Sequence, residues 1–218
     1  MSNEAERRGV LLDLGSVLAR VDIDDFDQLA ADVGADLDDL VEVLVGDYAD
    51  DNDHPFHRAE RGEVTLTAAL DDIEPLAQAR GFSIASLRTR LLEPSAELNT
   101  PLLDEVARLR HDGWWTGVIT NSVVEYAGII DALLPWDELF DVVIDSCRVG
   151  MRKPDPRIFR RALGQTGLEP ADVVFVDDQA GNVAAAAALG MRTLHAERYD
   201  LIASQVRNLA DKWVVDPG

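Results

Sequence analysis

The sequence predicts an α/β fold: a Rossmann-like core of parallel strands flanked by helices, with a small all-helical domain inserted after the first strand. Two observations support this prediction. Short apolar runs alternate with helical patterns over most of the chain, which implies right-handed crossovers and a parallel sheet. The stretch 21–94 interrupts the alternation, because its apolar residues recur at helical spacing and no convincing strand appears in it.

Five short apolar runs are the expected strands of the core, at 10–12, 115–119, 142–144, 173–176 and 192–194. Five helical patterns lie between or after them, at 102–111, 123–133, 156–166, 181–189 and 201–213. Gly113, Gly167 and Gly190 follow three of these patterns and are suitable helix stops. Strands and helices of this length and order are typical of a doubly covered parallel sheet.

The insertion begins with apolar residues three or four positions apart, such as Phe26, Leu29 and Val33. The same spacing continues over 37–44, 65–79 and 83–92 and predicts further helices. We therefore divide the chain into a core domain, residues 1–20 and 95–218, and a helical cap domain, residues 21–94. A cap over a reactive crevice excludes water and contacts the substrate.

Polar residues follow the ends of several core strands. Asp13 follows the first, Thr120 the second, and Asp177 with Asp178 the fourth, while Lys153 lies in the loop after the third. Ligands of open α/β sheets bind beyond the carboxyl ends of the strands, so a parallel sheet would bring these groups into one crevice. Two adjacent carboxylates after a buried strand need compensation, and Mg²⁺ suits such hard oxygen ligands.

These residues fit phosphoryl transfer through a covalent aspartyl-phosphate. Asp13 would be the nucleophile. Lys153, with the hydroxyl and backbone of Thr120, would neutralise and orient the phosphate oxygens. Magnesium on Asp13 and Asp178 would reduce the repulsion between a carboxylate and an anionic substrate.

The ordered motifs resemble those of the haloacid dehalogenase-like (HAD) hydrolases over most of the chain. The resemblance rests on the segment 13–18, on Thr120-Asn121, on Lys153 within 150–156, and on Asp177-Asp178 with Asn182 and 190–191. It implies a phosphatase-type enzyme in which Asp13 and Lys153 are catalytic and Thr120, Asn121 and Lys153 bind the substrate. It also implies Mg²⁺ held by Asp13, Asp178 and the backbone carbonyl of Gly15.

Two residues near the acidic pair are expected to support the site. Asn182 would orient Lys153 or Asp178, and Asp177 would be a supporting carboxylate or an occasional metal ligand. His195 ends the last strand and is expected to lie away from the site.

Gly15 departs from the commonest pattern of the family, in which a second Asp two residues after the nucleophile is the general acid and base. Such an acid typically contributes about 10²–10⁴-fold to the rate. Its absence favours a substrate with a good leaving group, such as a sugar 1-phosphate. The same Gly and the segment 56–64 resemble bacterial glucose-1-phosphate phosphatases and, more distantly, the N-terminal domain of soluble epoxide hydrolases.

Composition limits the classes of partner. The 218 residues carry a formal net charge of −21, which argues against nucleic acid as a partner. No apolar run approaches the length of a membrane span, the first eight residues are polar, and Cys147 is the only cysteine, so we expect a cytoplasmic protein without membrane contact. The expected partner is a small soluble phosphate ester, and the protein could be a monomer or a homodimer.

Two other functions stay open. A 2-haloacid dehalogenase-type hydrolase also uses an Asp nucleophile and needs no acid for its halide, although the Asp177-Asp178 pair argues against it. A catalytically impaired phosphate-binding protein would also explain Gly15. The roles of four cap residues are open too, since they could contact a substrate or lie on a polar helix: His54, His57, Arg58 and Arg61.

Overall fold

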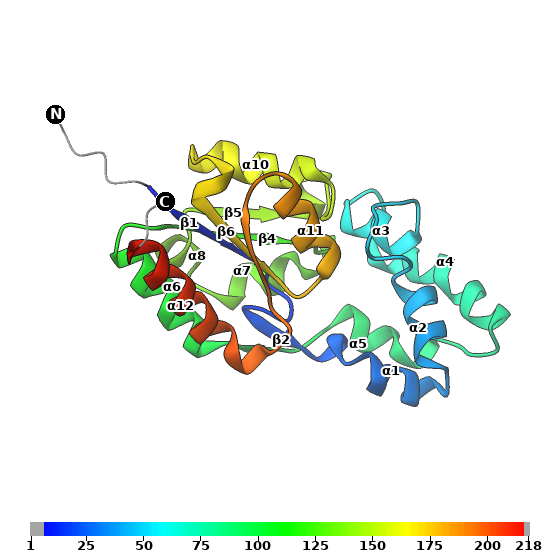
Figure 1. Cartoon of the computed structure of the whole chain (residues 1–218). Helices are drawn as coiled ribbons and strands as arrows, with labels where there is room; N and C mark the ends of the chain where they lie inside the picture. The colour runs from blue at the N-terminus through cyan, green and yellow to red at the C-terminus, as the bar shows by residue number, and fades with distance from the viewer. Residues whose placement is uncertain (1–6, 216–218) are drawn as a thin grey trace.

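The computed structural model describes residues 7–215 and confirms the α/β fold with a parallel sheet (Figure 1). The sheet has the strand order β5-β4-β1-β6-β7, and every pairing in it is parallel. Its strands are β1 (Gly9–Leu12), β4 (Trp115–Thr120), β5 (Val142–Asp145), β6 (Val173–Asp177) and β7 (Arg192–His195). Each is one residue longer than the sequence predicts.

Both faces of the sheet are buried, because alternate residues of each strand point to opposite sides. Val10 and Leu12 of β1 face a cluster formed with α6 (Thr100–His111), α7 (Ala127–Leu133), α8 (Trp136–Leu139) and α12 (Ile202–Val215). Leu11 faces the opposite cluster, formed with α10 (Pro156–Thr166) and α11 (Ala180–Ala188). Figure 1 shows these two helical layers on either side of the strands.

Helix bounds differ from the prediction mainly where side chains fix a helix end. Helix α6 begins two residues earlier, because the Asn99 side chain accepts a hydrogen bond from the N–H of Leu102. The pattern at 123–133 divides into a 3₁₀ turn, η3 (Val124–Tyr126), and α7. The short helices α8 and α9 (Ser146–Val149) have no signature in the sequence. The remaining 3₁₀ turns are η1 (Asp22–Asp24), η2 (Ala85–Leu87), η4 (Pro170–Asp172) and η5 (Tyr199–Leu201).

The inserted segment folds as five helices around a core of its own. They are α1 (Phe26–Val33), α2 (Leu37–Leu44), α3 (Pro55–Glu60), α4 (Leu66–Ala79) and α5 (Arg88–Leu92). Leu29, Leu40, Leu70 and Ile73 are fully buried in their common core. We call this segment the cap; Figure 1 shows it beside the sheet.

A short antiparallel ladder joins the cap to the sheet domain. β2 (Ala19–Val21) pairs with β3 (Ala96–Leu98), and hydrogen bonds from Asp22 to Ser95 and from Asn99 to Leu18 extend the ladder at both ends. The sequence does not predict these strands, because three residues are too few to show a period. The chain thus enters and leaves the cap through two adjacent segments.

Among the helices of residues 7–215, none is both long and apolar enough to cross a bilayer.

Candidate active site

Asp13 and Asp177 lie at the ends of neighbouring strands, and Lys153 contacts both of their carboxylates. The Nζ atom of Lys153 lies 2.7 Å from Asp13 Oδ1 and 2.7 Å from Asp177 Oδ2. Strand pairing sets this geometry, because the Asp13 N–H continues the β1–β6 ladder by donating to Val176 O at 2.9 Å. A second N–H, that of Leu14, donates to Asp13 Oδ1 at 2.7 Å and fixes the carboxylate.

Lys153 is fully buried, and Asn121 holds its backbone. The Lys153 N–H donates to Asn121 Oδ1 at 2.8 Å, and Asn121 Nδ2 donates to Lys153 O at 3.0 Å. This reciprocal pair connects the loop after β4 with the loop that carries Lys153. Thr120, the last residue of β4, is also buried and lines the same cavity.

Asp177 accepts hydrogen bonds from three residues and is fully buried. Besides Lys153, its donors are the Gln179 N–H at 2.8 Å and the Asn182 side-chain amide at 3.0 and 3.1 Å. Asn182 therefore orients Asp177, whereas the sequence suggested a direct contact with Lys153 or Asp178. Asn182 is the third residue of α11, so the first turn of this helix brings its amide to the Asp177 carboxylate.

Asp178 is half-buried, lines the cavity and accepts a hydrogen bond from Gln179 Nε2 at 2.8 Å. His195 Nε2 lies 2.9 Å from the backbone oxygen of Asp178. The expectation that His195 lies away from the site was wrong. β7 pairs in parallel with β6 and places Asp177 opposite His195.

The charges of this cluster shift the pKa values of Asp13 and Lys153. Burial raises the pKa of Asp13 well above its ordinary value, and Asp177 and Asp178 add to this effect, while Lys153 opposes it. Burial alone would lower the pKa of Lys153, but Asp13 and Asp177 outweigh it, so the pKa is raised and the ammonium group stays charged. One ammonium group thus contacts the carboxylates of Asp13 and Asp177, and the carboxylate of Asp178 lies in the same cluster.

The same carboxylates could hold a divalent cation. One ligand oxygen from each of Asp13, Asp177 and Asp178 lies within 4.8 Å of the others. Asp177 is already occupied by three donors, which favours Asp13 and Asp178 as the ligands. Gly15 lines the cavity beside them. Oxygen ligands and an excess of negative charge fit Mg²⁺.

A cavity of about 410 Å³ lies between this cluster and the cap. Asp13, Thr120, Lys153 and Asp178 form its polar side, and apolar residues of the cap and of α7 form most of the remaining wall. Water can therefore be displaced from the carboxylates when the cavity is filled.

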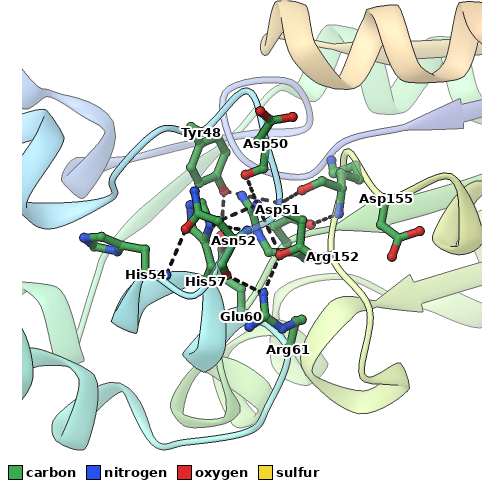
Figure 2. A network of polar contacts seen from close by, with 12 residues as sticks. Tyr48, Asp50, Asp51, Asn52, His54, His57, Glu60, Arg61, Arg152 and Asp155 are labelled. Atoms are coloured by element: carbon green, nitrogen blue, oxygen red, sulfur yellow. Dashed lines mark hydrogen bonds and ion pairs between the residues drawn. The ribbon is translucent and has the colours of Figure 1, made fainter.

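A second buried network, shown in Figure 2, links the cap to the loop of Lys153. Arg152 is fully buried and donates from Nε to Glu60 Oε2 at 2.7 Å, with its guanidinium carbon 4.6 Å from the centre of the Tyr48 ring. The Tyr48 hydroxyl donates to Glu60 Oε1 at 2.5 Å and accepts a hydrogen bond from Asn121 Nδ2 at 3.4 Å. Asn121 therefore contacts both Lys153 and the cap.

The four basic cap residues whose roles were open do not line the cavity. His54 Nδ1 accepts a hydrogen bond from the Phe56 N–H and caps α3. His57 is buried, and burial together with the nearby Arg152 lowers its pKa to about 3. Arg61 pairs with Asp51 and Glu63, and Arg58 lies 3.5 Å from Glu63. With the hydrogen bond that the Asn52 N–H donates to His57 Nδ1 at 3.3 Å, these contacts give all four residues structural partners.

Comparison with known proteins agrees with this geometry. A family model described as haloacid dehalogenase-like hydrolase matches residues 8–190. The flavin mononucleotide hydrolase 1 of Arabidopsis thaliana is 34% identical over 151 residues, 67% of this chain and 61% of that protein. The sesquiterpene phosphatase astK of Aspergillus oryzae is 32% identical over 148 residues, 66% of this chain and 73% of that protein.

A third relative, the bifunctional epoxide hydrolase 2 of Rattus norvegicus, is 32% identical over 117 residues, 52% of this chain and 21% of that protein. The chain spans between 15% and 27% of the length of several such curated relatives. Among solved structures, a predicted HAD-like family hydrolase from Porphyromonas gingivalis superposes with a TM-score of 0.67, at 24% identity over 94% of this chain and 98% of that one.

Proposed function

The chain belongs to the haloacid dehalogenase-like hydrolase family, and we propose that it is a magnesium-dependent phosphatase acting on a small phosphate monoester through a phosphorylated Asp13. The observation that carries the proposal is the contact of one buried lysine with two carboxylates at the polar side of the cavity. The sesquiterpene phosphatase and the flavin mononucleotide hydrolase among the relatives support it, although their names refer to different esters.

In this mechanism an Asp13 oxygen attacks the phosphorus atom, and the bond from phosphorus to the ester oxygen breaks. Lys153 neutralises a phosphate oxygen, and the Thr120 hydroxyl and nearby backbone N–H groups orient the others. Gly15 offers no proton, so the departing oxygen takes one from water. A second water then attacks the phosphorus of phospho-Asp13, which releases phosphate and restores the carboxylate. Magnesium, when bound, supplies positive charge that offsets the repulsion between the carboxylates and the phosphate.

Phosphate release from an aryl phosphate, with Mg²⁺ or with EDTA, tests this proposal. We expect turnover with Mg²⁺ that EDTA abolishes. Asp13→Asn should abolish turnover and leave the fold intact, because the amide keeps the size of the side chain. Asp145→Asn is the matched control, since Asp145 also ends a core strand and is buried but does not line the cavity.

Four results would contradict the proposal. Full activity of Asp13→Asn would exclude the nucleophile, and activity unchanged by EDTA would exclude the metal. Halide release from 2-haloacids without any phosphate release would favour the dehalogenase alternative. Tight phosphate binding without turnover of any ester would favour a binding protein. A cytoplasmic location and a monomeric or homodimeric state belong to the same proposal.

A further inference from the structure

The cavity wall opposite the carboxylates is apolar. Thirteen cap residues line it, and eleven of them carry no polar side-chain atom: Val21, Ile23, Phe26, Val41, Leu44, Val45, Phe56, Leu66, Leu70, Leu91 and Pro94. Ile129, Ile130 and Leu133 of α7 continue the same surface on the side of the sheet domain. The polar lining residues gather instead around the strand ends and the loops that follow them.

The two polar cap residues in the wall, Tyr48 and Glu60, bond to each other. The Tyr48 hydroxyl donates to one oxygen of Glu60, and Arg152 Nε donates to the other. On the opposite side, the Tyr126 hydroxyl donates to the backbone oxygen of Leu91. The polar atoms nearest the apolar wall are thus bonded within the protein.

A polyhydroxylated substrate would be poorly accommodated in this cavity. A sugar would leave water with several hydroxyls facing methyl and methylene groups, and each unpartnered hydroxyl would weaken binding by roughly 5- to 150-fold. A hydrocarbon group has no such penalty, and apolar cavities readily take up apolar ligands. A volume of about 410 Å³ lies in the range of cavities that enclose a small organic molecule.

We infer that the substrate is the phosphate monoester of an apolar alcohol, whose hydrocarbon part fills the cap cavity while its phosphate contacts Asp13 and Lys153. This inference rests on the proposed phosphatase function and names the substrate class of the same site. The reaction is unchanged: the ester and water give the apolar alcohol and phosphate, with cleavage between phosphorus and the ester oxygen. It replaces the sugar 1-phosphate that the leaving-group argument suggests, because the cavity wall decides which ester binds, whereas the absence of an acid at Gly15 lowers only the rate at which an unactivated ester is cleaved.

A series of n-alkyl phosphates from ethyl to octyl, with sugar 1-phosphates as polar counterparts, tests the inference. Dissociation constants are measured by calorimetry on Asp13→Asn, and kcat/KM on the unaltered protein with Mg²⁺. Each added methylene should improve both quantities about fourfold until the cavity is full. The sugar 1-phosphates should bind no better than ethyl phosphate.

Val41→Thr places a hydroxyl in the apolar wall at nearly constant volume. We expect it to weaken octyl phosphate binding about fivefold while leaving ethyl phosphate unchanged. Val143→Thr makes the same change at a position of β5 that is 40% exposed and lies outside the cavity, and it should alter neither ligand.

Measuring binding and turnover separately distinguishes a failure of this inference from a failure of the proposed phosphatase function. Turnover of ethyl and octyl phosphate with equal kcat/KM and equal affinity would overturn the inference and leave the phosphatase in place. Affinity that rises with chain length, without turnover of either the alkyl phosphates or an aryl phosphate, would support the apolar site and contradict the phosphatase. Stronger binding of sugar 1-phosphates than of octyl phosphate would also overturn the inference.

Discussion

Removing Arg152 should destabilise the protein more than removing any surface ion pair does. The Arg152 side chain is fully buried, the Glu60 side chain is 3% exposed, and their atoms are 2.7 Å apart. Arg152→Met removes the cation and leaves a carboxylate in the protein interior with Tyr48 as its remaining donor. Breaking a buried pair on one side typically costs about 3–5 kcal/mol, so we expect a loss of this size in the free energy of unfolding.

Chemical denaturation with urea measures this loss, and a double-mutant cycle isolates the pair. Arg152→Met combined with Glu60→Leu should cost clearly less than the sum of the two single changes, since no unpaired charge remains. Arg80→Met is the control. Arg80 also pairs with two cap carboxylates, on Asp39 and Glu42, but this cluster is exposed, and its loss should change stability little.

The pH dependence of the Arg152→Met variant has a predictable sign. Burial raises the pKa of Glu60 above its ordinary value of 4.5, and Arg152 and Tyr48 oppose that rise. Without Arg152 the folded-state pKa rises further, while the unfolded value stays the same. The variant therefore keeps its stability below the pKa that Glu60 has in the unfolded chain. It loses stability as pH rises toward the higher pKa that Glu60 has in the folded variant. A loss below about 1 kcal/mol in the free energy of unfolding of Arg152→Met at neutral pH would refute the buried pair. Strictly additive effects of the two single substitutions would refute it too.

Three further predictions concern single residues. Asp178→Asn should raise the Mg²⁺ concentration needed for half-maximal phosphate release. It should leave the free energy of unfolding unchanged, because the Asp178 side chain is half-buried. An unchanged Mg²⁺ titration would exclude Asp178 as a ligand. Asp155→Ala removes the cap of α10 and should cost about 1 kcal/mol at pH 7 in urea denaturation. Burial would raise the pKa of Asp155, but hydrogen bonds from Arg157 outweigh it and lower the pKa, so this difference should vanish as pH falls through the folded value. His57 should stay neutral from pH 5 to pH 7.5, because burial and Arg152 hold its pKa at about 3; an NMR titration of its ring with a midpoint near pH 6.5 would contradict its buried position.

The sequence predicts the sheet and the meeting of Asp13, Lys153 and Asp177 because both follow from short-range rules. Apolar runs mark the strands, and parallel strands bring residues at their carboxyl ends to one edge. The partner of Asn182 and the position of His195 depend on strand order and register, which the sequence leaves undetermined. β2 and β3 are too short to show a period in the sequence, and they form strands only by pairing with each other.

The Arg152–Glu60 pair and the cavity wall show a second limit on what the sequence can predict. Arg152 and Glu60 are separated by 92 positions, and no local pattern connects them. Leu66 and Leu70 have the same helical spacing as any core residue, so periodicity does not distinguish a side chain that packs on another helix from one that lines a cavity. The apolar character of the cavity wall is therefore visible only in the folded structure.

Trapping the covalent intermediate tests the central claim most directly. The protein is mixed with Mg²⁺ and an excess of an aryl phosphate, quenched in acid within one turnover, digested and measured by mass spectrometry. We predict that the peptide containing Asp13 gains one phosphoryl group, and that Asp13→Asn gains none. Phosphate release without that modified peptide, or a phosphoryl group on another residue, would contradict the account.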